Sequence, residues 1–469
     1  MIYRNYIGGK WHDEGELADI KNPWDDVTVA QYHVATPDLV NKAIEVAHGA
    51  NDKMRHLSPY LRQQILKQLS ERLRERREEF STTICMESAK PIQAAQLEVG
   101  RAITVLSIAA EEVGRSNGEV IQLSTTGFGN GQYGITRRFP VGPVSAISPY
   151  NFPLNLGMHK VAPAIAAGCP IIWKPSLLAP GTAFLFAELV AETDLPTGAM
   201  NVITPTDTDA EPLITDPRMR LLSFTGSAAV GWTLMGKARG KRTVLELGGN
   251  AAVIIGPDAN IDDAVLQCKV GGYIYSGQVC ISVQRILVHK SNLKEFTSKF
   301  VSAVSELKIG DPMEKDTYIG PMISDREAIR VKEWIMEAKS MGAKILIGGG
   351  QVDRMVEPTI LTKVPHTANI WKEEAFGPVT IIEEFEGWDH AFAMVNDSRY
   401  GLQAGIFTND IAVIKRAFEE LQVGALIVNG SPSFRADNMP YGGIKDSGIG
   451  REGVRYAIEE MTELRFLVT

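Results

Sequence analysis

Cys280 is the residue of this chain whose type and setting best suit a nucleophile. It lies in the stretch 271–285, directly after a Ser-Gly-Gln turn at 276–278 and just before the alternating segment 281–288, which predicts a strand. A thiol on a bend at the start of a strand is accessible to a ligand, and a thiolate is a strong nucleophile. A cysteine is more often a small buried hydrophobe, so this stretch alone leaves both interpretations open.

Two polar side chains elsewhere could assist such a thiol. Glu246 ends the apolar segment 243–247, and a carboxylate in an apolar strand has a raised pKa unless it is paired, which suits a general base. A capping or salt-bridged glutamate fits this pattern equally well. Asn151, in the segment 148–153, supplies an amide that can donate to a developing oxyanion, as can the backbone N–H of Cys280.

Three segments invite a nucleotide-binding interpretation. Segment 224–231 follows a predicted strand and opens a helix at Ser227, so its free backbone N–H groups can face a pyrophosphate. Lys174 ends another strand and can reach a ribose or phosphate, although a lysine before a proline is otherwise simply a surface residue. The literal G-x-G-x-x-G at 448–453 lies too near the C-terminus to begin a βαβ unit, so it predicts a tight loop.

The composition limits the classes of function. With 469 residues, 44% hydrophobic and 22% charged, the chain is expected to be an ordinary globular protein with more than one domain. Its net charge of −8 argues against a nucleic-acid or anionic-membrane surface. No signal-like segment and no long apolar run occur, so a cytoplasmic protein is expected. The 4 cysteines and 8 histidines lack ligand spacing, so no disulfide framework and no metal site are expected, and Cys169 and Cys268 are expected to be buried.

Predicted strands and helices place the candidate residues at strand ends. Strand-like runs at 144–147, 170–174, 200–203 and 221–224 alternate with helices at about 154–167, 180–193 and 227–238. This order indicates a parallel sheet covered on both faces, which binds ligands beyond the carboxyl ends of its strands. A second α/β unit follows residue 248, with strands at 251–255, 281–289 and 344–347 and helices at 292–306 and 325–341.

Two further segments lie outside these units. Residues 121–138 are rich in Gly, Thr and Ser and predict a hairpin that interrupts a helical region at 59–80 and 86–114. Residues 452–469 predict a helix and a short strand at 464–468. A terminal strand can add to a neighbour's sheet edge, so hairpin and tail are expected to form one oligomer interface, with a simple surface hairpin as the alternative.

Seven segments together resemble the NAD(P)-dependent aldehyde dehydrogenase superfamily, in the family's order and over essentially the full length. They are Pro149-Tyr150-Asn151-Phe152-Pro153, Lys174-Pro175-Ser176, Phe224-Thr225-Gly226-Ser227, Leu245-Glu246-Leu247-Gly248-Gly249, Gly277-Gln278-Val279-Cys280, Glu374-Ala375-Phe376-Gly377-Pro378 and Pro440-Tyr441-Gly442-Gly443-Ile444-Lys445-Asp446-Ser447-Gly448. The resemblance implies an α/β fold with a Rossmann-type cofactor domain at 1–118 and 140–246 and an α/β catalytic domain at 247–436. It also implies bridging segments at 119–139 and 437–469, which include a β-hairpin oligomerisation arm, in a homodimer or homotetramer.

The same resemblance implies the oxidation of a small aldehyde with NAD or NADP. Cys280 would be the nucleophile, Asn151 an oxyanion donor, and Glu246 the base that activates water to hydrolyse a thioester. Lys174 and Glu374 match positions that hold the adenosine and nicotinamide riboses. The positions assigned to cofactor contact are Ile147, Ser148, Pro149, Lys174, Ser176, Leu177, Gly226, Ser227, Val230, Leu247, Glu374 and Phe376.

Leu177 departs from the pattern of NAD-preferring relatives. Those relatives usually carry a glutamate three residues after the lysine, where it binds the adenosine ribose hydroxyls and repels a 2′-phosphate. This chain has Leu177 there, so we predict that NADP is accepted, with Lys174 and Ser176 as its contacts.

Arginines point to an anionic substrate. Arg101 and Arg435 fall where members acting on phosphate-, sulfonate- or carboxylate-bearing aldehydes resemble one another in using arginines, and a guanidinium pair favours an anion. His159 is a third candidate substrate residue, with a purely structural role as the alternative. Val279 stands where some phosphate-recognising members have another arginine. We therefore predict a small anionic aldehyde, with a neutral hydroxyaldehyde resembling lactaldehyde as the alternative.

Two other functions fit the same scaffold. Acyl transfer to coenzyme A would release the thioester with a thiol, but members of that kind generally lack the glutamate that is present here as Glu246. A non-catalytic structural or binding relative would be expected to lose the cysteine or its partners. This chain keeps Cys280, Glu246 and Asn151, so an aldehyde dehydrogenase is favoured.

Overall fold

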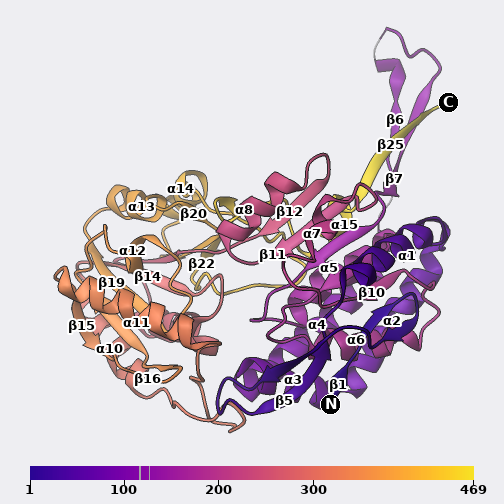
Figure 1. Ribbon diagram of the computed structural model, residues 1–469. Coiled ribbons are helices and arrows are strands. Elements are labelled where there is room, and N and C mark those ends of the chain that lie inside the picture. The colour runs from indigo at the N-terminus through magenta and orange to yellow at the C-terminus, as the bar shows by residue number, and fades with distance from the viewer. Residues whose placement is uncertain (116–117, 126) are drawn as a thin grey trace.

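The computed structural model describes residues 1–115, 118–125 and 127–469. Residues 116, 117 and 126, which fall within the predicted ranges 1–118, 119–139 and 121–138, lie outside the described part. Figure 1 shows two α/β lobes side by side and a narrow arm that projects from the body and carries the C-terminus. The predicted α/β fold with parallel sheets is confirmed.

An eight-stranded sheet forms the core of the first lobe, in the order β24-β12-β11-β8-β9-β10-β2-β3. The strands from β12 to β10 in this order pair in parallel, whereas β24, β2 and β3 are antiparallel additions. The bounds are β2 Asn5–Ile7, β3 Lys10–His12, β8 Val144–Ile147, β9 Ile171–Lys174, β10 Met200–Val202, β11 Leu221–Thr225, β12 Arg242–Glu246 and β24 Gly448–Ile449.

Helices cover both faces of this sheet. Ile171 packs in the core that α2 to α6 form, and the next residue, Ile172, packs against α1, α7 and α8 on the other face, because successive strand side chains point to opposite sides. The bounds are α1 Pro37–His56, α2 Pro59–Glu75, α3 Arg77–Ser88, α4 Ile92–Glu112, α5 Asn155–Ala167, α6 Gly181–Ala191, α7 Glu211–Thr215, α8 Ala228–Lys237 and α15 Val454–Glu460.

The second lobe contains a seven-stranded sheet in the order β15-β18-β19-β14-β13-β21-β22, parallel except for β15. Val253 faces α9 and α10, and Ile254 faces α11 to α14. The bounds are β13 Ala251–Ile255, β14 Val283–His289, β15 Lys344–Ile347, β18 Thr359–Thr362, β19 Val379–Phe385, β21 Gln403–Phe407, β22 Ala425–Val428, α9 Ile261–Tyr273, α10 Leu293–Ser305, α11 Asp325–Ser340, α12 Asn369–Lys372, α13 Trp388–Asn396 and α14 Ile411–Glu420.

Smaller elements complete the described fold. Strands β1, β4 and β5 form a three-stranded sheet, and β16–β17 and β20–β23 form two-stranded ones. The bounds are β1 Ile2–Tyr3, β4 Leu17–Lys21, β5 Thr28–His33, β16 Gln351–Val352, β17 Met355–Val356, β20 Tyr400–Gly401, β23 Ile444–Lys445 and the 3₁₀ helices η1 Leu123–Thr125 and η2 Ile274–Gly277.

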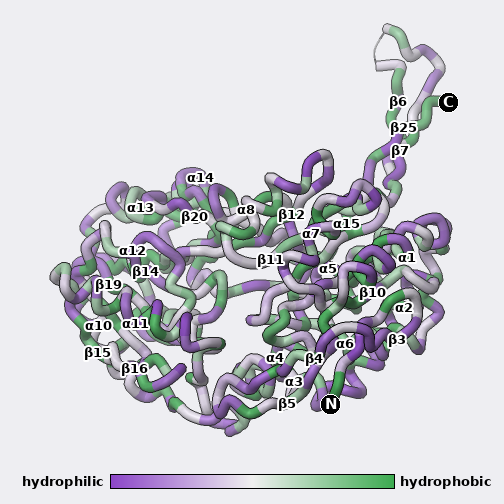
Figure 2. The backbone as a smooth tube through the Cα atoms, viewed as in Figure 1, coloured by the Kyte–Doolittle hydropathy of each residue, from purple (hydrophilic) through white to green (hydrophobic). Residues whose placement is uncertain are grey.

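The arm consists of β6 Val120–Gln122, β7 Tyr133–Pro140 and β25 Thr462–Val468. The predicted hairpin and tail strand are therefore present, and β25 pairs antiparallel with β7 of its own chain. Figure 2 shows hydrophobic stretches along these projecting strands. Large apolar side chains stay exposed on them, namely those of Val120, Leu464, Phe466, Leu467 and Val468.

The structure divides two predicted helices. The region 59–80 is broken at Arg76, which separates α2 from α3, and the region 86–114 is broken at residues 89–91. Ala89 takes a left-handed φ of 51°, and Pro91 cannot donate the backbone hydrogen bond that a continuous helix requires. The segment 448–453, for which a tight loop is predicted, instead begins with the short strand β24, which pairs with β12, and only the residues after that strand form a loop before α15. None of the described helices is long and apolar enough to cross a membrane.

Candidate active site

A tightly bent turn positions Cys280. Ser276 and Gly277 have positive φ angles of 53° and 68°. A Cβ atom on Gly277 would lie 2.1 Å from the carbonyl oxygen of Gly377, so glycine is required there. The Ser276 hydroxyl donates to the Gly320 carbonyl at 2.7 Å, which ties the turn to the loop between α10 and α11.

The Cys280 side chain lies where two cavities meet. The larger cavity, of about 450 Å³, is also lined by Asn151, Glu246 and Glu374. The smaller one, of about 190 Å³, is lined by Arg101, Phe152, Arg435 and Tyr441, among others. Cys280 is partly exposed, whereas the other three cysteines are buried, as expected for Cys169 and Cys268. The one accessible thiol can therefore meet a ligand from either side.

The Cys280 thiol has an aromatic hydroxyl as its neighbour. Its Sγ lies 3.1 Å from the hydroxyl oxygen of Tyr441. Burial raises the pKa of Cys280 to about 11, and the hydrogen bond with Tyr441 opposes that rise. The resting thiol is therefore protonated at neutral pH and must lose its proton before it can attack.

Glu246 ends β12 with a carboxyl group that is free to take a proton. It is 3% exposed, and neither of its oxygens has a hydrogen-bond partner within the described part of the chain. Burial, with the negative charge of Glu452, raises the pKa of Glu246 well above its ordinary value, while Arg435 and Lys160 oppose the rise. Such a carboxyl group suits a general base that works near neutral pH.

Asn151 lies against the turn that carries the thiol. Its Nδ2 donates to the backbone carbonyl of Gln278 at 2.9 Å, and the side chain is buried. Gln278 is itself held, because its Oε1 accepts from the Ile323 N–H at 3.0 Å. An asparagine amide has two N–H donors, so one remains to face a ligand at Cys280.

The larger cavity has features that fit a dinucleotide. Gly226 and Ser227 line it at the N-terminus of α8, where backbone N–H groups without helical partners attract a phosphate. The Thr225 hydroxyl beside them is buried without a hydrogen-bond partner among the described residues. The unpaired Thr225 hydroxyl and the N-terminus of α8 therefore offer hydrogen-bond donors that a pyrophosphate can accept from.

Glu374 and Phe376 also line this cavity. The Glu374 carboxylate accepts from the Gly249 N–H at 3.0 Å, and a Cβ atom on Gly248 would lie 2.2 Å from its Oε2. Burial raises the pKa of Glu374 to about 7. Phe376 packs edge to face against Tyr150 at 6.3 Å between ring centroids.

The cavity gathers half of the predicted cofactor residues. Those that line it are Pro149, Gly226, Ser227, Leu247, Glu374 and Phe376, and those outside its lining are Ile147, Ser148, Lys174, Ser176, Leu177 and Val230. Ser148 accepts from the Trp173 indole at 2.8 Å and is buried. Lys174 donates to Asp207 at 3.1 Å, and the Asp207 side chain is 96% exposed, so this pair can separate.

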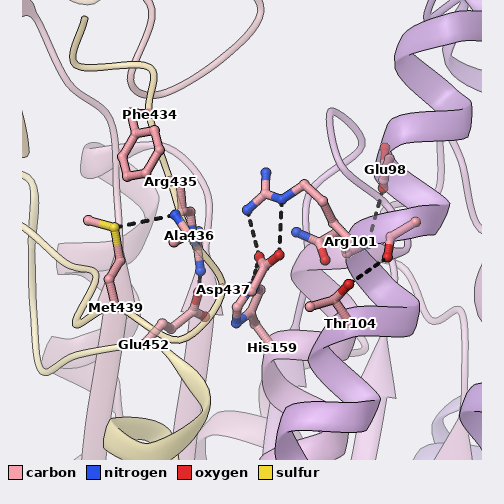
Figure 3. Close-up of polar contacts among 12 residues, drawn as sticks. Glu98, Arg101, Thr104, His159, Phe434, Arg435, Ala436, Asp437, Met439 and Glu452 are labelled. Atoms are coloured by element: carbon pink, nitrogen blue, oxygen red, sulfur yellow. Dashed lines mark hydrogen bonds and ion pairs between the residues drawn. The ribbon is translucent and has the colours of Figure 1, made fainter. Parts of the chain in front are cut away.

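The smaller cavity brings Arg101 of α4 and Arg435 together with Cys280. Figure 3 shows that two guanidinium nitrogens of Arg101 donate to the Asp437 carboxylate, while the third nitrogen points away from it. The shorter of these bonds is 2.7 Å, from Nη2 to Oδ1. Arg101 is held in one orientation and still has N–H groups to offer.

His159 lies behind this cavity rather than in its wall. It is fully buried, and its Nε2 lies 3.0 Å from the Oδ1 of Asp437. Burial lowers the pKa of His159 to about 4, so the ring is neutral near pH 7. Although burial works in the other direction, the bonds from His159 and Arg101 hold the pKa of Asp437 below its usual range. His159 therefore reaches Arg101 through Asp437, and a direct substrate contact by His159 stays a prediction.

Arg435 belongs to a buried ionic cluster. It stacks over the Tyr441 ring at 3.6 Å and donates to Glu452 at 3.2 Å, and its Nε has no partner in the described structure. Lys160 donates to the other oxygen of Glu452 at 2.7 Å. Although burial works against it, the charges of Lys160 and Arg435 lower the pKa of Glu452 to about 2. Two cations thus share one carboxylate.

Sequence reasoning missed several of these residues. Asp437 and Glu452 are single acidic residues without a distinguishing spacing, and Asp437 meets His159 across 278 positions. Tyr441 lies within one of the recognised segments, but nothing in the sequence pointed its hydroxyl at Cys280. Among the residues that the structure describes, no group of three or more His, Cys, Asp or Glu side chains could hold a metal ion.

An accessible thiol thus lies between a cavity with features that fit a dinucleotide and a smaller cavity lined by two arginines. The chain belongs to the aldehyde dehydrogenase family, whose model matches residues 11–467. The resemblance in the sequence is thereby confirmed, and with it the enzyme class.

Individual relatives are similar over nearly the full length. The chain is 41% identical to 3-sulfolactaldehyde dehydrogenase of Priestia megaterium, over 99% of this chain and 98% of that protein. It is 36% identical to lactaldehyde dehydrogenase of Methanococcus vannielii, over 99% of both.

Two solved structures share the fold closely. Aldehyde dehydrogenase 21 of Physcomitrella patens, in complex with its reaction product succinate, has a TM-score of 0.98 and 41% identity, over 100% of this chain and 98% of that one. Glyceraldehyde-3-phosphate dehydrogenase of Methanocaldococcus jannaschii, complexed with NADP, has a TM-score of 0.92 and 36% identity, over 96% of this chain and 98% of that one. The bound NADP agrees with the predicted cofactor class.

Proposed function

We propose that this enzyme oxidises a small anionic aldehyde to its carboxylate, with NADP or NAD as cofactor. The observation that carries the proposal is the position of Cys280 between the cavity that suits a dinucleotide and the cavity that contains Arg101 and Arg435. An aldehyde in the smaller cavity would present its carbonyl carbon to the sulfur, and its anionic group would lie toward the arginines.

The side chains divide the chemistry between them. The Cys280 thiol loses its proton to solvent, and the resulting thiolate adds to the carbonyl carbon. The new oxyanion accepts hydrogen bonds from Asn151 and the backbone N–H of Cys280. A nicotinamide held by Glu374 and Phe376 would supply the hydride acceptor. Glu246 then takes a proton from water as the water attacks the thioester, and the sulfur departs as thiolate. A water-activating glutamate favours hydrolysis over transfer to coenzyme A.

The charges around the smaller cavity support an anionic substrate. Lys90 pairs with Glu98, and Arg101 pairs with Asp437, so these cations are balanced. Among the described residues, Glu452 is the only carboxylate paired with both Lys160 and Arg435. These two cations and one carboxylate leave one positive charge unbalanced when Glu246 is protonated. Relatives that act on a sulfonate or a phosphate aldehyde, or that release succinate, are consistent with this excess.

A matched substrate pair tests the proposal. 3-Sulfolactaldehyde and lactaldehyde differ by a sulfonate, and a charge-assisted hydrogen bond contributes about 1.5–3 kcal/mol, so kcat/KM should favour the sulfonate by about 10- to 150-fold. Arg101→Met should remove most of that preference, because it takes away the guanidinium N–H groups and leaves the charge of Asp437 without its partner. Arg455→Met, at a 68% exposed arginine outside the lining of both cavities, is the control. Equal turnover of both aldehydes, unaffected by Arg101→Met, would support the neutral hydroxyaldehyde instead.

We also propose that the arm joins copies of this chain. Its apolar side chains, Leu464, Phe466 and Leu467 among them, are 49–59% exposed on a projecting sheet, and a second copy would cover them. The proposed bridging segments 119–139 and 437–469 contain β6, β25 and all of β7 except its last residue, Pro140. Light scattering should find a dimer or tetramer, and a Phe466→Asp variant should shift the mass toward the monomer.

A further inference from the structure

Tyr441 lies against the nucleophile without having been assigned any part in the reaction. Its hydroxyl oxygen is 3.1 Å from Cys280 Sγ, and its side chain lines the smaller cavity. The backbone is fixed on both sides, because the Tyr441 N–H donates to the Glu452 carbonyl at 2.9 Å and the Glu452 N–H donates back at 2.7 Å. Arg435 stacks on the ring at 3.6 Å. The hydroxyl is therefore held in one place, at the sulfur.

The proton in this contact must belong to Tyr441 once the thiol ionises. A thiolate has no proton to give, so it can only accept. Burial, reinforced by the charge of Cys280, raises the pKa of Tyr441 well above its ordinary value, although Arg435 opposes the rise. The phenol therefore keeps its proton near neutral pH, and it is the group that can donate to an ionised sulfur.

The other charged groups that face Cys280 divide in their effect. Glu374 and Glu246 raise the pKa of the thiol, and Arg435 lowers it. Arg435 also pairs with the negative charge of Glu452, which weakens its lowering of the thiol pKa. The neutral Tyr441 hydroxyl, in direct contact with the sulfur, is therefore the group best placed to oppose the rise in thiol pKa that burial causes.

We infer that Tyr441 is a further catalytic residue, whose hydroxyl donates a hydrogen bond that stabilises the Cys280 thiolate and holds Sγ at the junction of the two cavities. This inference rests on the proposed role of Cys280 as nucleophile. The hydrogen bond is strong while the sulfur is charged and weak once the carbon–sulfur bond makes the sulfur neutral. Tyr441 therefore stabilises the thiolate that attacks the aldehyde and, in the same way, the thiolate that departs when the thioester is hydrolysed.

Alkylation by iodoacetamide across a pH series tests this inference without turnover. Cys85, Cys169 and Cys268 are buried, so alkylation of the native enzyme reports on Cys280, and Cys280→Ser gives the background. Tyr441→Phe keeps the ring under Arg435 and removes the hydroxyl. It should raise the thiol pKa by about 1 to 2, and slow alkylation at neutral pH by about 10- to 100-fold.

Tyr273→Phe is the matched control. The Tyr273 hydroxyl is also buried, donates to the Thr359 carbonyl at 2.9 Å and lies 2.8 Å from the Thr380 hydroxyl, away from the sulfur. It should lower the melting temperature and leave the thiol pKa unchanged. If Tyr441→Phe does not fold, 3-fluorotyrosine at position 441 replaces it, because the stronger donor should lower the thiol pKa.

The outcomes separate the two proposals. A thiol pKa that Tyr441→Phe leaves unchanged in a folded enzyme, or that 3-fluorotyrosine does not lower, overturns the role of Tyr441. Full turnover by Cys280→Ser instead overturns the proposed function itself. An inactive Cys280→Ser together with an unchanged thiol pKa in Tyr441→Phe removes only the role of Tyr441.

Discussion

Replacing Glu246 by glutamine is expected to stop the enzyme after it has formed the thioester. Both carboxyl oxygens of Glu246 lack hydrogen-bond partners within the described structure, so the isosteric glutamine loses no such contact. It also removes a charge that lies near that of Glu452, so folding should not be weakened. The effect is therefore chemical, and the loss of a general base should slow hydrolysis by about 10²- to 10⁴-fold.

The pH dependence follows from the same carboxyl group. Its pKa is raised, and only the ionised form can accept a proton from water. The rate of hydrolysis in the unsubstituted enzyme should therefore increase with pH through this raised pKa and then level off. Glu246→Gln should lose that dependence.

Stopped-flow absorbance of the reduced cofactor measures both steps. Glu246→Gln should give a burst of about one reduced cofactor per active site, followed by a steady-state rate that is lower by about 10²- to 10⁴-fold. Glu386→Gln, at a 72% exposed carboxylate, should behave like the unsubstituted enzyme. A variant that keeps its steady-state rate, or that loses the burst itself, would refute the assignment of Glu246 to hydrolysis.

Three further substitutions test the packing and the cofactor site. Glu98→Gln leaves buried Lys90 without its partner and should lower the free energy of unfolding in urea by about 3–5 kcal/mol; a loss below about 1 kcal/mol would contradict the pairing. Gly277→Ala places a Cβ atom 2.1 Å from the Gly377 carbonyl and should lower both the melting temperature and kcat, whereas normal kinetics would show that the turn is not needed. Leu177→Glu should weaken NADP binding more than about tenfold relative to NAD in calorimetry, and an unchanged ratio would exclude a role of this position.

Local patterns in the sequence predicted the strands and the three central residues. The strand at 144–147 was predicted to the residue, and the strand at 221–224 was one residue short, because continuous apolar runs between helices give a clear signal. Cys280, Glu246 and Asn151 were found because each is a polar side chain next to a predicted strand. The structure brings all three to the wall of one cavity.

Contacts between distant segments could not be predicted in this way. Arg101 and Asp437 are 336 positions apart, and Cys280 and Tyr441 are 161 apart, so no local periodicity links them. The break at Ala89 was not predicted, because residues with helical spacing continue on both sides of it. Arg101 was expected to bind an anionic substrate, and only the folded chain shows that its guanidinium also pairs with the Asp437 carboxylate.

The identity of the residue that carries the acyl group tests the central claim most directly. Glu246→Gln is mixed with NADP and an aldehyde that bears an anionic group, quenched in acid, digested and examined by mass spectrometry. The account predicts an acyl mass on the peptide that contains Cys280, and none when Cys280→Ser is combined with Glu246→Gln. An acyl group on another residue, or turnover by an enzyme that lacks Cys280, would contradict it.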